Sequence, residues 1–396
     1  MTRDDGAGSD EVSAGFPAGF PMVGILGGGQ LGRMLGLAAL RMGLGVRFYR
    51  EPGSHSGPTD GLTEAHTGPM DDAEALRAFV TGCSVVTLEN EWLALDVLRQ
   101  QLPAGVPLWP SVSTMALVGD KVEQKAHAQR HQLPVGAYRA CATEAELRDA
   151  AAELGYPVVV KRPRHSYDGY GNATARDWDE LLAAFARLGE GQPRVLVEGW
   201  VPFERELAVM VARRPGGQDV AYPVATTVQQ HHRCVAVEVP ARVRPEVAAA
   251  ATDLARRAAA AYGCVGVVGV EMFERADGSL LLNEIAPRPH NTGHYTIEAC
   301  VTSQFENHLR AVLDWPLGDP SLLRPVAVMV NVLGRREGEA SARAMPAALA
   351  ARDVAVHVYG KRRVRPGRKM GHVTALGDDL DDARARAQRV ADQLDL

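Results

Sequence analysis

Two glutamates, Glu271 and Glu284, flank an Asp277-Gly278 dipeptide, and each lies in an apolar run. Asp-Gly between apolar runs is a strong hairpin signal, and a two-residue turn requires positive φ at both positions. With Asp277 and Gly278 at the tip, Glu271 pairs with Glu284. Facing carboxylates repel each other unless a cation lies between them, and Mg²⁺ prefers oxygen ligands and usually arrives with substrate phosphates. The spacing therefore predicts a magnesium–nucleotide site, with two solvated surface glutamates as the alternative.

The segment directly after the second glutamate is rich in groups that bind ligands. Residues 285–294 contain Arg288, His290, His294 and two prolines. Prolines stiffen the backbone, and convergent polar side chains fix the orientation of a ligand. This composition favours the site over the solvated sheet face.

Two lysines could bind phosphates. Lys121 lies where a helix is expected, and Lys161 ends the apolar run 156–161, just before a glycine-containing loop at 167–172. A lysine on a strand before a flexible loop can hold nucleotide phosphates while the loop closes over them. A surface lysine followed by a plain turn is the alternative.

Glu198 and Glu206 lie at the two ends of a segment that could hold a nucleoside. A strand that leads into a glycine-containing hinge can offer backbone groups to adenine, and the carboxylate that follows can accept ribose hydroxyls. Trp200 and Phe203, between them, fit a stacking role and a core role equally well.

Gly27–Gly32 matches G-x-G-x-x-G between an expected strand and an expected helix. This arrangement binds phosphate at a helix N-terminus. A dinucleotide is the obvious ligand, with Glu51 as the ribose-binding acid, but a mononucleotide or sugar phosphate fits the same geometry. Nothing downstream supplies hydride-transfer chemistry, which disfavours a nicotinamide or flavin cofactor. A basic cluster at 359–372 indicates an anionic small substrate.

The bulk composition is that of an ordinary globular protein. The chain has 396 residues, 46% hydrophobic and 23% charged, with a net charge of −5. These values predict two or three domains, no nucleic-acid partner and no membrane association. The five cysteines form no C-x-x-C pair, and no hydrophobic signal segment is present, so a reduced cytoplasm is the expected location.

The pattern of elements predicts a mixed α/β and α+β fold in several parts. Residues 1–20 are expected to form a disordered leader, 21–115 an open βαβ-type sheet, 116–325 a second domain and 326–396 a β-rich C-terminal domain that ends in an amphipathic helix. Within the second domain, a long helix is expected to begin at Pro245 and to stop at Gly263.

Several segments closely resemble the 5-(carboxyamino)imidazole ribonucleotide synthases, the ATP-grasp enzymes of bacterial purine synthesis. The segments that carry the resemblance are Gly27–Leu35, Tyr167–Gly171, Val201–Leu207, Asn283–Ala299 and Pro366–His372. The resemblance runs from about Met22 to Gly377. It implies an ATP-grasp fold with a Rossmann-like N-terminal domain and a small β-rich C-terminal domain, usually in a homodimer. The implied reaction joins bicarbonate to aminoimidazole ribonucleotide at the expense of ATP.

The resemblance also implies roles for individual residues. ATP would be held by Lys121, Lys161, Glu198, the backbone of Val201, and Glu206. Magnesium would be carried by Glu271 and Glu284. Bicarbonate and the carboxyphosphate intermediate would be surrounded by Tyr167, Asp168, Arg288 and His290. The ribonucleotide would be bound by Gly29, Gln30, Leu31, Glu89, Lys361, Arg368 and Lys369.

The loop after Lys161 departs from the family pattern. His165-Ser166 replaces two glycines, and Tyr170 replaces a cationic residue. Glycines leave a lid more freedom than His-Ser does, and the lost cation removes an anion contact. The departures leave the amine acceptor open, so a relative from specialised metabolism that acts on another amine is the first alternative. Formate-dependent formylation of glycinamide ribonucleotide is a second, against which the segment 291–295 argues. A nicotinamide-dependent dehydrogenase and a non-catalytic nucleotide-binding protein are the others.

Overall fold

The computed structural model describes residues 19–53, 57–91, 93, 95–164, 171–230, 233–394 and 396. The predicted loop residues Tyr167 and Asp168, and the unusual His165-Ser166 pair, lie outside the described residues. In the described part, no helix combines the length and the apolar character needed to cross a membrane.

The N-terminal part is a five-stranded parallel sheet in the order β3-β2-β1-β4-β5, as the βαβ pattern predicted. Its strands are β1 (Met22–Leu26), β2 (Gly45–Arg50), β3 (Ala65–Thr67), β4 (Val85–Leu88) and β5 (Leu108–Trp109). Its helices are α1 (Gln30–Arg41), α2 (Ala73–Val80), α3 (Asp96–Gln101) and α4 (Val112–Val118). The glycine-rich turn after β1 and the acidic segment after β4 share the carboxyl edge of the sheet, where such folds bind ligands.

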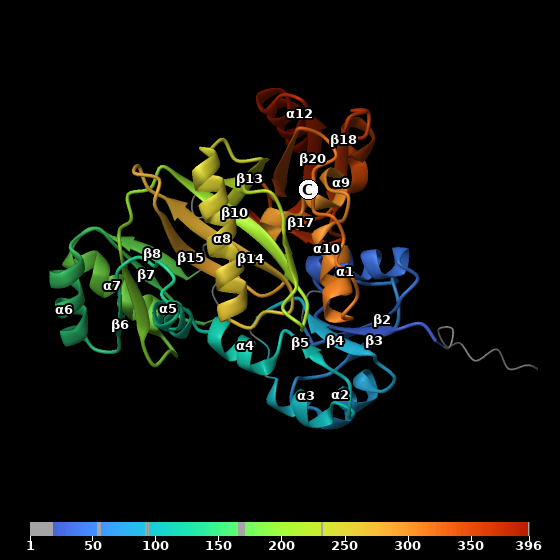
Figure 1. Cartoon of the computed structure of the whole chain (residues 1–396), viewed down its shortest axis with the longest axis horizontal. Coiled ribbons are helices and arrows are strands. Elements are labelled where there is room, and N and C mark those ends of the chain that lie inside the picture. The colour runs from blue at the N-terminus through green and yellow to red at the C-terminus, as the bar shows by residue number, and fades with distance from the viewer. Residues whose placement is uncertain are drawn as a thin grey trace, which may run out of the picture.

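A small antiparallel sheet forms a separate lobe, drawn in green in Figure 1. Its strand order is β6-β9-β7-β8. The strands are β6 (Tyr138–Cys141), β7 (Val158–Lys161), β8 (Asn172–Ala175) and β9 (Val195–Gly199). Helices α6 (Glu144–Leu154) and α7 (Trp178–Gly189) belong to this lobe, and α5 (Lys121–Arg130) precedes it in the chain. Leu147 of α6 and Leu181 of α7 share one buried core with Val158 and Val195 of the sheet.

The third sheet has nine strands, and it runs from the predicted hairpin into the C-terminal segment. Its order is β15-β14-β10-β12-β13-β16-β20-β18, with β11 paired to β10. Its strands are β10 (Arg205–Arg213), β11 (Asp219–Ala221), β12 (Ala225–Gln230), β13 (Arg233–Val239), β14 (Gly266–Glu274), β15 (Leu280–Ala286), β16 (Val326–Leu333), β18 (Val354–Val358) and β20 (Lys369–Gly377). The β-rich C-terminal segment therefore shares its sheet with the preceding part, because β16 pairs with β13.

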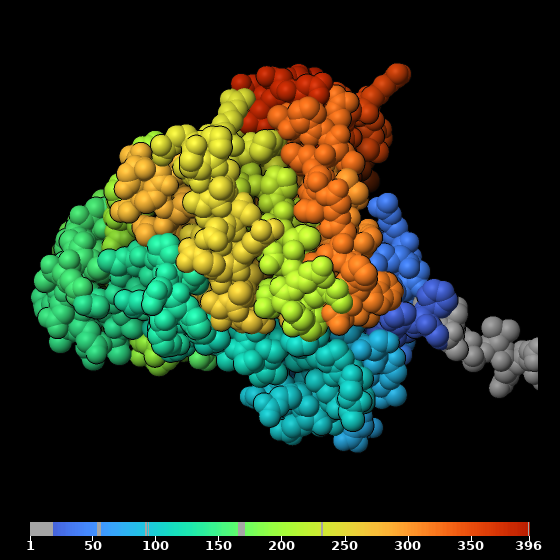
Figure 2. Space-filling model, in the orientation of Figure 1, coloured from blue at the N-terminus to red at the C-terminus, as the bar shows by residue number. Residues whose placement is uncertain are grey.

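Helices cover this sheet and complete the C-terminal part. They are α8 (Pro245–Ala261), α9 (Thr296–Ala299), α10 (Gln304–Val312), α11 (Met345–Ala348) and α12 (Leu380–Gln393), with short 3₁₀ turns at Asn291–Gly293 and Ala342–Ala344 and a two-stranded ribbon of β17 (Gly338–Glu339) and β19 (Arg363–Val364). Helix α8 begins and stops as predicted, and Gly263 adopts a φ of 61° just beyond its end. One face of α8 packs against the sheet, and the opposite face lies on the molecular surface, in yellow in Figure 2.

A buried histidine joins the N-terminal sheet to the large sheet. His308 of α10 accepts a hydrogen bond at Nδ1 from the backbone N–H of Val267, at 3.0 Å. Its Nε2 must therefore carry the proton, and it lies 2.8 Å from the hydroxyl of Thr87 on β4. Burial lowers the pKa of His308 to about 3, so the ring is neutral. Gly266, next to it, has no room for a side chain.

The β14–β15 hairpin pairs Glu271 with Glu284 as predicted, but its tip differs from the prediction. The backbone N–H of Arg275 bonds to the carbonyl of Ser279, so the loop holds 276–278, one residue more than a two-residue turn. Only Gly278 of the Asp-Gly pair has positive φ. The Asp277 carboxylate accepts the N–H of Ser279, an Asx turn that needs no left-handed aspartate.

A β-bulge restores the predicted pairing. Met272 pairs with Leu282 and Glu271 with Glu284, which leaves Asn283 as the extra residue on β15. The bulge offsets the longer tip by one position. It also brings Asn283 and Glu284, which strict alternation would direct to opposite faces, to the same cavity.

Candidate active site

All predicted site residues in the described part of the chain line one cavity of about 990 Å³. The cavity is bounded by the carboxyl edge of the N-terminal sheet, the green lobe, the hairpin and the segment between β19 and β20. The residues that the structure brings together are Gly29, Gln30, Leu31, Glu89, Lys121, Lys161, Glu198, Val201, Glu206, Glu271, Glu284, Arg288, His290, Lys361, Arg368 and Lys369.

Glu198 lies between two lysines at one end of the cavity. Lys161 ends β7 and contacts Glu198 Oε2 on the neighbouring strand β9, while Lys125 Nζ from α5 lies 2.8 Å from Glu198 Oε1. Burial alone would raise the pKa of Glu198, but the two lysines hold it at about 2. Lys161 also donates to Asn283 Oδ1 at 3.3 Å. Glu198 is therefore ionised, and two lysines against one carboxylate give the cluster a formal surplus of positive charge.

The hairpin carboxylates behave differently from each other. Glu284 Oε1 lies 2.8 Å from Lys121 Nζ. Although burial opposes ionisation, Lys121, Lys161 and His290 hold the pKa of Glu284 at about 2. Burial, followed by repulsion from Glu284 and Glu206, raises the pKa of Glu271 to about 8. The paired strands thus bring two carboxyl groups to the same cavity. Glu284 ionises readily, whereas Glu271 resists ionisation.

This donor set fits magnesium. Glu271 and Glu284 supply hard oxygen ligands. Burial and then repulsion between carboxylates raise the pKa of Glu271, and a divalent cation would relieve that repulsion. Among the residues that the structure describes, no group of three or more His, Cys, Asp or Glu side chains forms a closed metal site. A magnesium ion held here by two carboxylates would keep positions for phosphate and water oxygens, as Mg²⁺ usually does.

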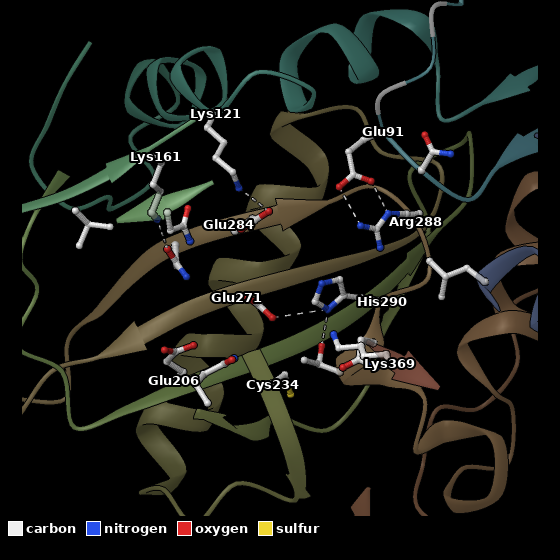
Figure 3. Close-up of a pocket in the computed structure, with 18 of the residues that line it drawn as sticks. Glu91, Lys121, Lys161, Glu206, Cys234, Glu271, Glu284, Arg288, His290 and Lys369 are labelled. Carbon is white, nitrogen blue, oxygen red and sulfur yellow. Dashed lines mark hydrogen bonds and ion pairs between the residues drawn. The ribbon is translucent and has the colours of Figure 1, made fainter. Parts of the chain in front are cut away.

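Arg288 and His290 follow β15 and face the middle of the cavity (Figure 3). Arg288 forms a two-point ion pair with Glu91, with Nε to Oε2 at 2.5 Å and Nη2 to Oε1 at 2.9 Å. Because Glu91 follows β4, this pair ties the hairpin to the N-terminal sheet. His290 Nδ1 lies 2.8 Å from the hydroxyl of Thr292 and 3.8 Å from Glu271 Oε1.

Gln304 on α10 and the backbone of β14 also hold His290 in place. Its N–H donates to Gln304 Oε1 at 2.9 Å, and the Gln304 amide donates back to the His290 carbonyl at 2.8 Å. On β14, a Cβ at Gly269 would lie 2.6 Å from the His290 Cβ. The space for this ring therefore requires glycine at position 269.

The glycine-rich turn is already occupied by a carboxylate of the chain. The Glu89 side chain accepts the N–H groups of Gly29 at 2.5 Å and Gly32 at 2.6 Å. Burial raises the pKa of Glu89, while these two bonds oppose the shift. In this arrangement a phosphate at the turn cannot use those two amides. Gln30 and Leu31, the next residues of α1, also line the cavity.

The basic C-terminal segment supplies cations at the same end. Lys361 and Lys369 are largely buried, and Lys361 Nζ donates to the carbonyl of Lys369 at 2.7 Å. Arg368 is half-buried and donates to the carbonyl of Arg363 at 2.7 Å. The hydroxyl of Tyr359, whose ring lies 5.7 Å from Lys361 Nζ, is 2.9 Å from His372 Nδ1.

Several cavity residues were not among the predicted ones, and three of them are Lys125, Asn283 and Glu91. Lys125 follows Lys121 by four residues, so a shared helical face could have been inferred from the sequence. Glu91 follows the same strand as Glu89 and was equally visible. Asn283 was not predictable, because only the bulge directs its side chain to the cavity.

Models of three domain families match consecutive parts of the chain. They are the ribonucleotide synthetase preATP-grasp domain over 21–118, the ATP-grasp domain over 126–305 and the phosphoribosylaminoimidazole carboxylase C-terminal domain over 327–386. The predicted ATP-grasp architecture is confirmed.

Named relatives cover nearly the whole chain. N5-carboxyaminoimidazole ribonucleotide synthase of Mycobacterium tuberculosis is 42% identical over 378 residues, which are 94% of this chain and 87% of that protein. The synthase of Synechococcus elongatus is 39% identical and covers 89% of this chain and 88% of its own length. The crystal structure of the Aspergillus clavatus synthase with ADP and 5-aminoimidazole ribonucleotide has a TM-score of 0.84 and 35% identity, over 95% of this chain and 99% of that one.

Proposed function

Because this chain belongs to the family of N5-carboxyaminoimidazole ribonucleotide synthases, we propose that its cavity carries out the ATP-dependent carboxylation of 5-aminoimidazole ribonucleotide in purine biosynthesis. The reaction forms a C–N bond and releases ADP and phosphate. The observation that carries the proposal is the single cavity in which the two hairpin carboxylates, the paired lysines, Arg288 and the basic C-terminal segment meet.

The end of the cavity between the green lobe and the hairpin is the proposed ATP site. Lys121 and Lys161 bind the phosphates, Glu198 and the backbone of Val201 contact adenine, and Glu206 accepts the ribose hydroxyls. The surplus positive charge around Glu198 supports this assignment, because a polyphosphate arrives with several negative charges. Glu206 lies on β10 beside the hairpin, and its carboxyl faces the same space.

Glu271 and Glu284 are the proposed magnesium ligands. A magnesium ion bound there supplies charge neutralisation for the phosphoryl group that moves from ATP to bicarbonate. Lys121, which contacts Glu284, contributes a positive charge at the same place and positions the carboxylate. Positioning and electrostatic stabilisation account for most of the catalysis of phosphoryl transfer.

Arg288 and His290 are the proposed residues around bicarbonate and carboxyphosphate. Arg288 presents a cationic guanidinium held in orientation by Glu91, and His290 is fixed on both sides by Thr292 and Gln304. Carboxyphosphate reacts with water, so the site must exclude solvent before the amine attacks it or the CO₂ that it releases. Tyr167 and Asp168, outside the described residues, are proposed to close over the intermediate.

The ribonucleotide is proposed to bind between the N-terminal sheet and the basic segment. Its contacts would come from Gly29, Gln30, Leu31, Glu89, Lys361, Arg368 and Lys369. We also propose a homodimer in the cytoplasm, with a leader at 1–20 and domains at 21–115, 116–325 and 326–396.

The proposal is tested by ADP release from purified protein with Mg-ATP and bicarbonate, with and without aminoimidazole ribonucleotide. Strong stimulation by the ribonucleotide, abolished in Glu284→Gln, is the expected result. Bicarbonate-dependent turnover without that stimulation would refute the acceptor but not the use of ATP. It would then point to another amine and to the His165-Ser166 loop.

A further inference from the structure

Lys125 is a buried cation for which the proposed function has no role. It lies one helical turn after Lys121 on α5, and its side chain is only 7% exposed. Its Nζ lies 2.8 Å from Glu198 Oε1 and donates to the carbonyl of Leu282 at 3.2 Å. One ammonium group thus joins α5, β9 and β15.

The two lysines of α5 serve different carboxylates. Lys121 contacts Glu284 on the hairpin, whereas Lys125 contacts Glu198 on the small sheet. Glu198 also contacts Lys161, so each of its two oxygens has its own lysine. A single lysine would suffice to balance the charge of Glu198, and the second is available for another partner.

Nucleotide binding would change the charge balance around Glu198. Under the proposed function, Lys161 engages the phosphates of ATP, and its contact with Glu198 then weakens. Glu198 is buried, and a buried carboxylate without a cationic partner is strongly unfavourable. The carboxylate would then take up a proton or move, and either change would disturb the adjacent backbone that is proposed to contact adenine.

We infer that Lys125 is a positioning residue that keeps Glu198 charged and in place while Lys161 binds the nucleotide phosphates. The remaining pair of Lys125 and Glu198 is neutral, so the full charge of Lys161 is free for the nucleotide. The Leu282 carbonyl fixes the ammonium of Lys125 from the hairpin side. Lys125 therefore acts through Glu198. The inference rests on the proposed role of Lys161.

A double-mutant cycle on ADP binding, measured by calorimetry, tests this inference. Lys125→Met should weaken ADP binding about tenfold or more. The melting temperature of the nucleotide-free variant should change little, because Lys161 still pairs with Glu198 there. In a Glu198→Gln background there is no charge to compensate, so Lys125→Met should cost less than about threefold. Lys121→Met is the matched control and should cost the same factor in both backgrounds, because Lys121 contacts Glu284.

Several results would overturn the inference. An equal loss from Lys125→Met in both backgrounds would make Lys125 a direct nucleotide ligand. A lower melting temperature with unchanged ADP affinity would make its role purely structural. Lys161→Met separates this inference from the proposed function. If Lys161→Met leaves ADP affinity unchanged, the proposed role of Lys161 fails. If only Lys125→Met is without effect, the inference alone fails.

Discussion

A methyl group added at Gly269 should disable the chemistry and leave ATP binding intact. Gly269 lies on β14 opposite His290, and an added Cβ would lie 2.6 Å from the His290 Cβ and 2.8 Å from its Cγ. Ordinary carbon–carbon contacts are about 3.5–4.0 Å, so the two backbones or the imidazole must separate by roughly 1 Å. Neither neighbour is the free end of a flexible chain. Gln304 holds the backbone of His290 through two hydrogen bonds and resists the shift.

The magnitude follows from that displacement. Misplacing a catalytic group by about 1 Å can cost about a hundredfold in rate, and overpacking typically costs about 1–3 kcal/mol of stability. We therefore expect kcat for ADP release to fall about a hundredfold in Gly269→Ala. The affinity for ADP should stay within about twofold, because the lysines proposed to hold the nucleotide lie on other elements.

Single-turnover ADP formation and calorimetric ADP binding measure the two quantities separately. Gly216→Ala is the matched control, since an added Cβ there meets nothing within 4 Å. A Gly269→Ala protein that turns over at the native rate would refute the steric argument and, with it, the need for a fixed His290. A joint loss of rate and nucleotide affinity would mean that the hairpin as a whole is disturbed.

Three further predictions concern the surroundings of the site. Glu91→Gln should lower kcat at least about tenfold, because Arg288 loses its charged partner; unchanged rates across a bicarbonate titration would contradict this. Gly27→Ala should weaken ribonucleotide binding in calorimetry, because Gly27 has a φ of 112° and a side chain there would overlap Glu89; native affinity would contradict the packing at the turn. Finally, His308 has a pKa of about 3 in the folded chain and 6.5 in the unfolded chain. Between these two pH values the unfolded chain binds a proton at His308 and the folded chain does not. His308 should therefore contribute a fall in the free energy of unfolding of about 1.4 kcal/mol per pH unit as the pH drops below about 6.5 toward 3. His308→Gln should reduce that slope in urea titrations, and an identical slope would show that other groups cause it.

The sequence predicted the site better than it predicted the local geometry that builds it. Glu271 and Glu284 were predicted to pair, and they do, although the turn was predicted one residue too short. The Asx turn at Asp277 and the bulge at Asn283 have compensating effects on register. The turn and the bulge depend on side-chain hydrogen bonds or on the twist of the folded sheet. The periodicity of apolar residues in the sequence does not indicate either of these.

Contacts between segments that are distant in the chain could not be predicted from the sequence either. Arg288 and Glu91 are far apart in the chain, and nothing in either segment indicates the other. The glycine-rich turn was predicted to offer its amides to a phosphate, yet Glu89 from another strand takes two of them. By contrast, Pro245 and Gly263 were enough to predict the bounds of helix α8, because local backbone preferences decide where a helix begins and ends.

The continuity of the nine-stranded sheet has a mechanical consequence. The hairpin and the segment around Lys369 belong to one hydrogen-bonded frame, so they cannot move apart without breaking strand pairs. Within the described residues, no strand of the β6-β9-β7-β8 lobe pairs with that frame. Side chains connect the two instead, such as Lys161 on β7, which donates to Asn283 Oδ1 on β15 at 3.3 Å. We therefore expect the lobe to move more easily relative to this frame than the hairpin and the segment around Lys369 move relative to each other.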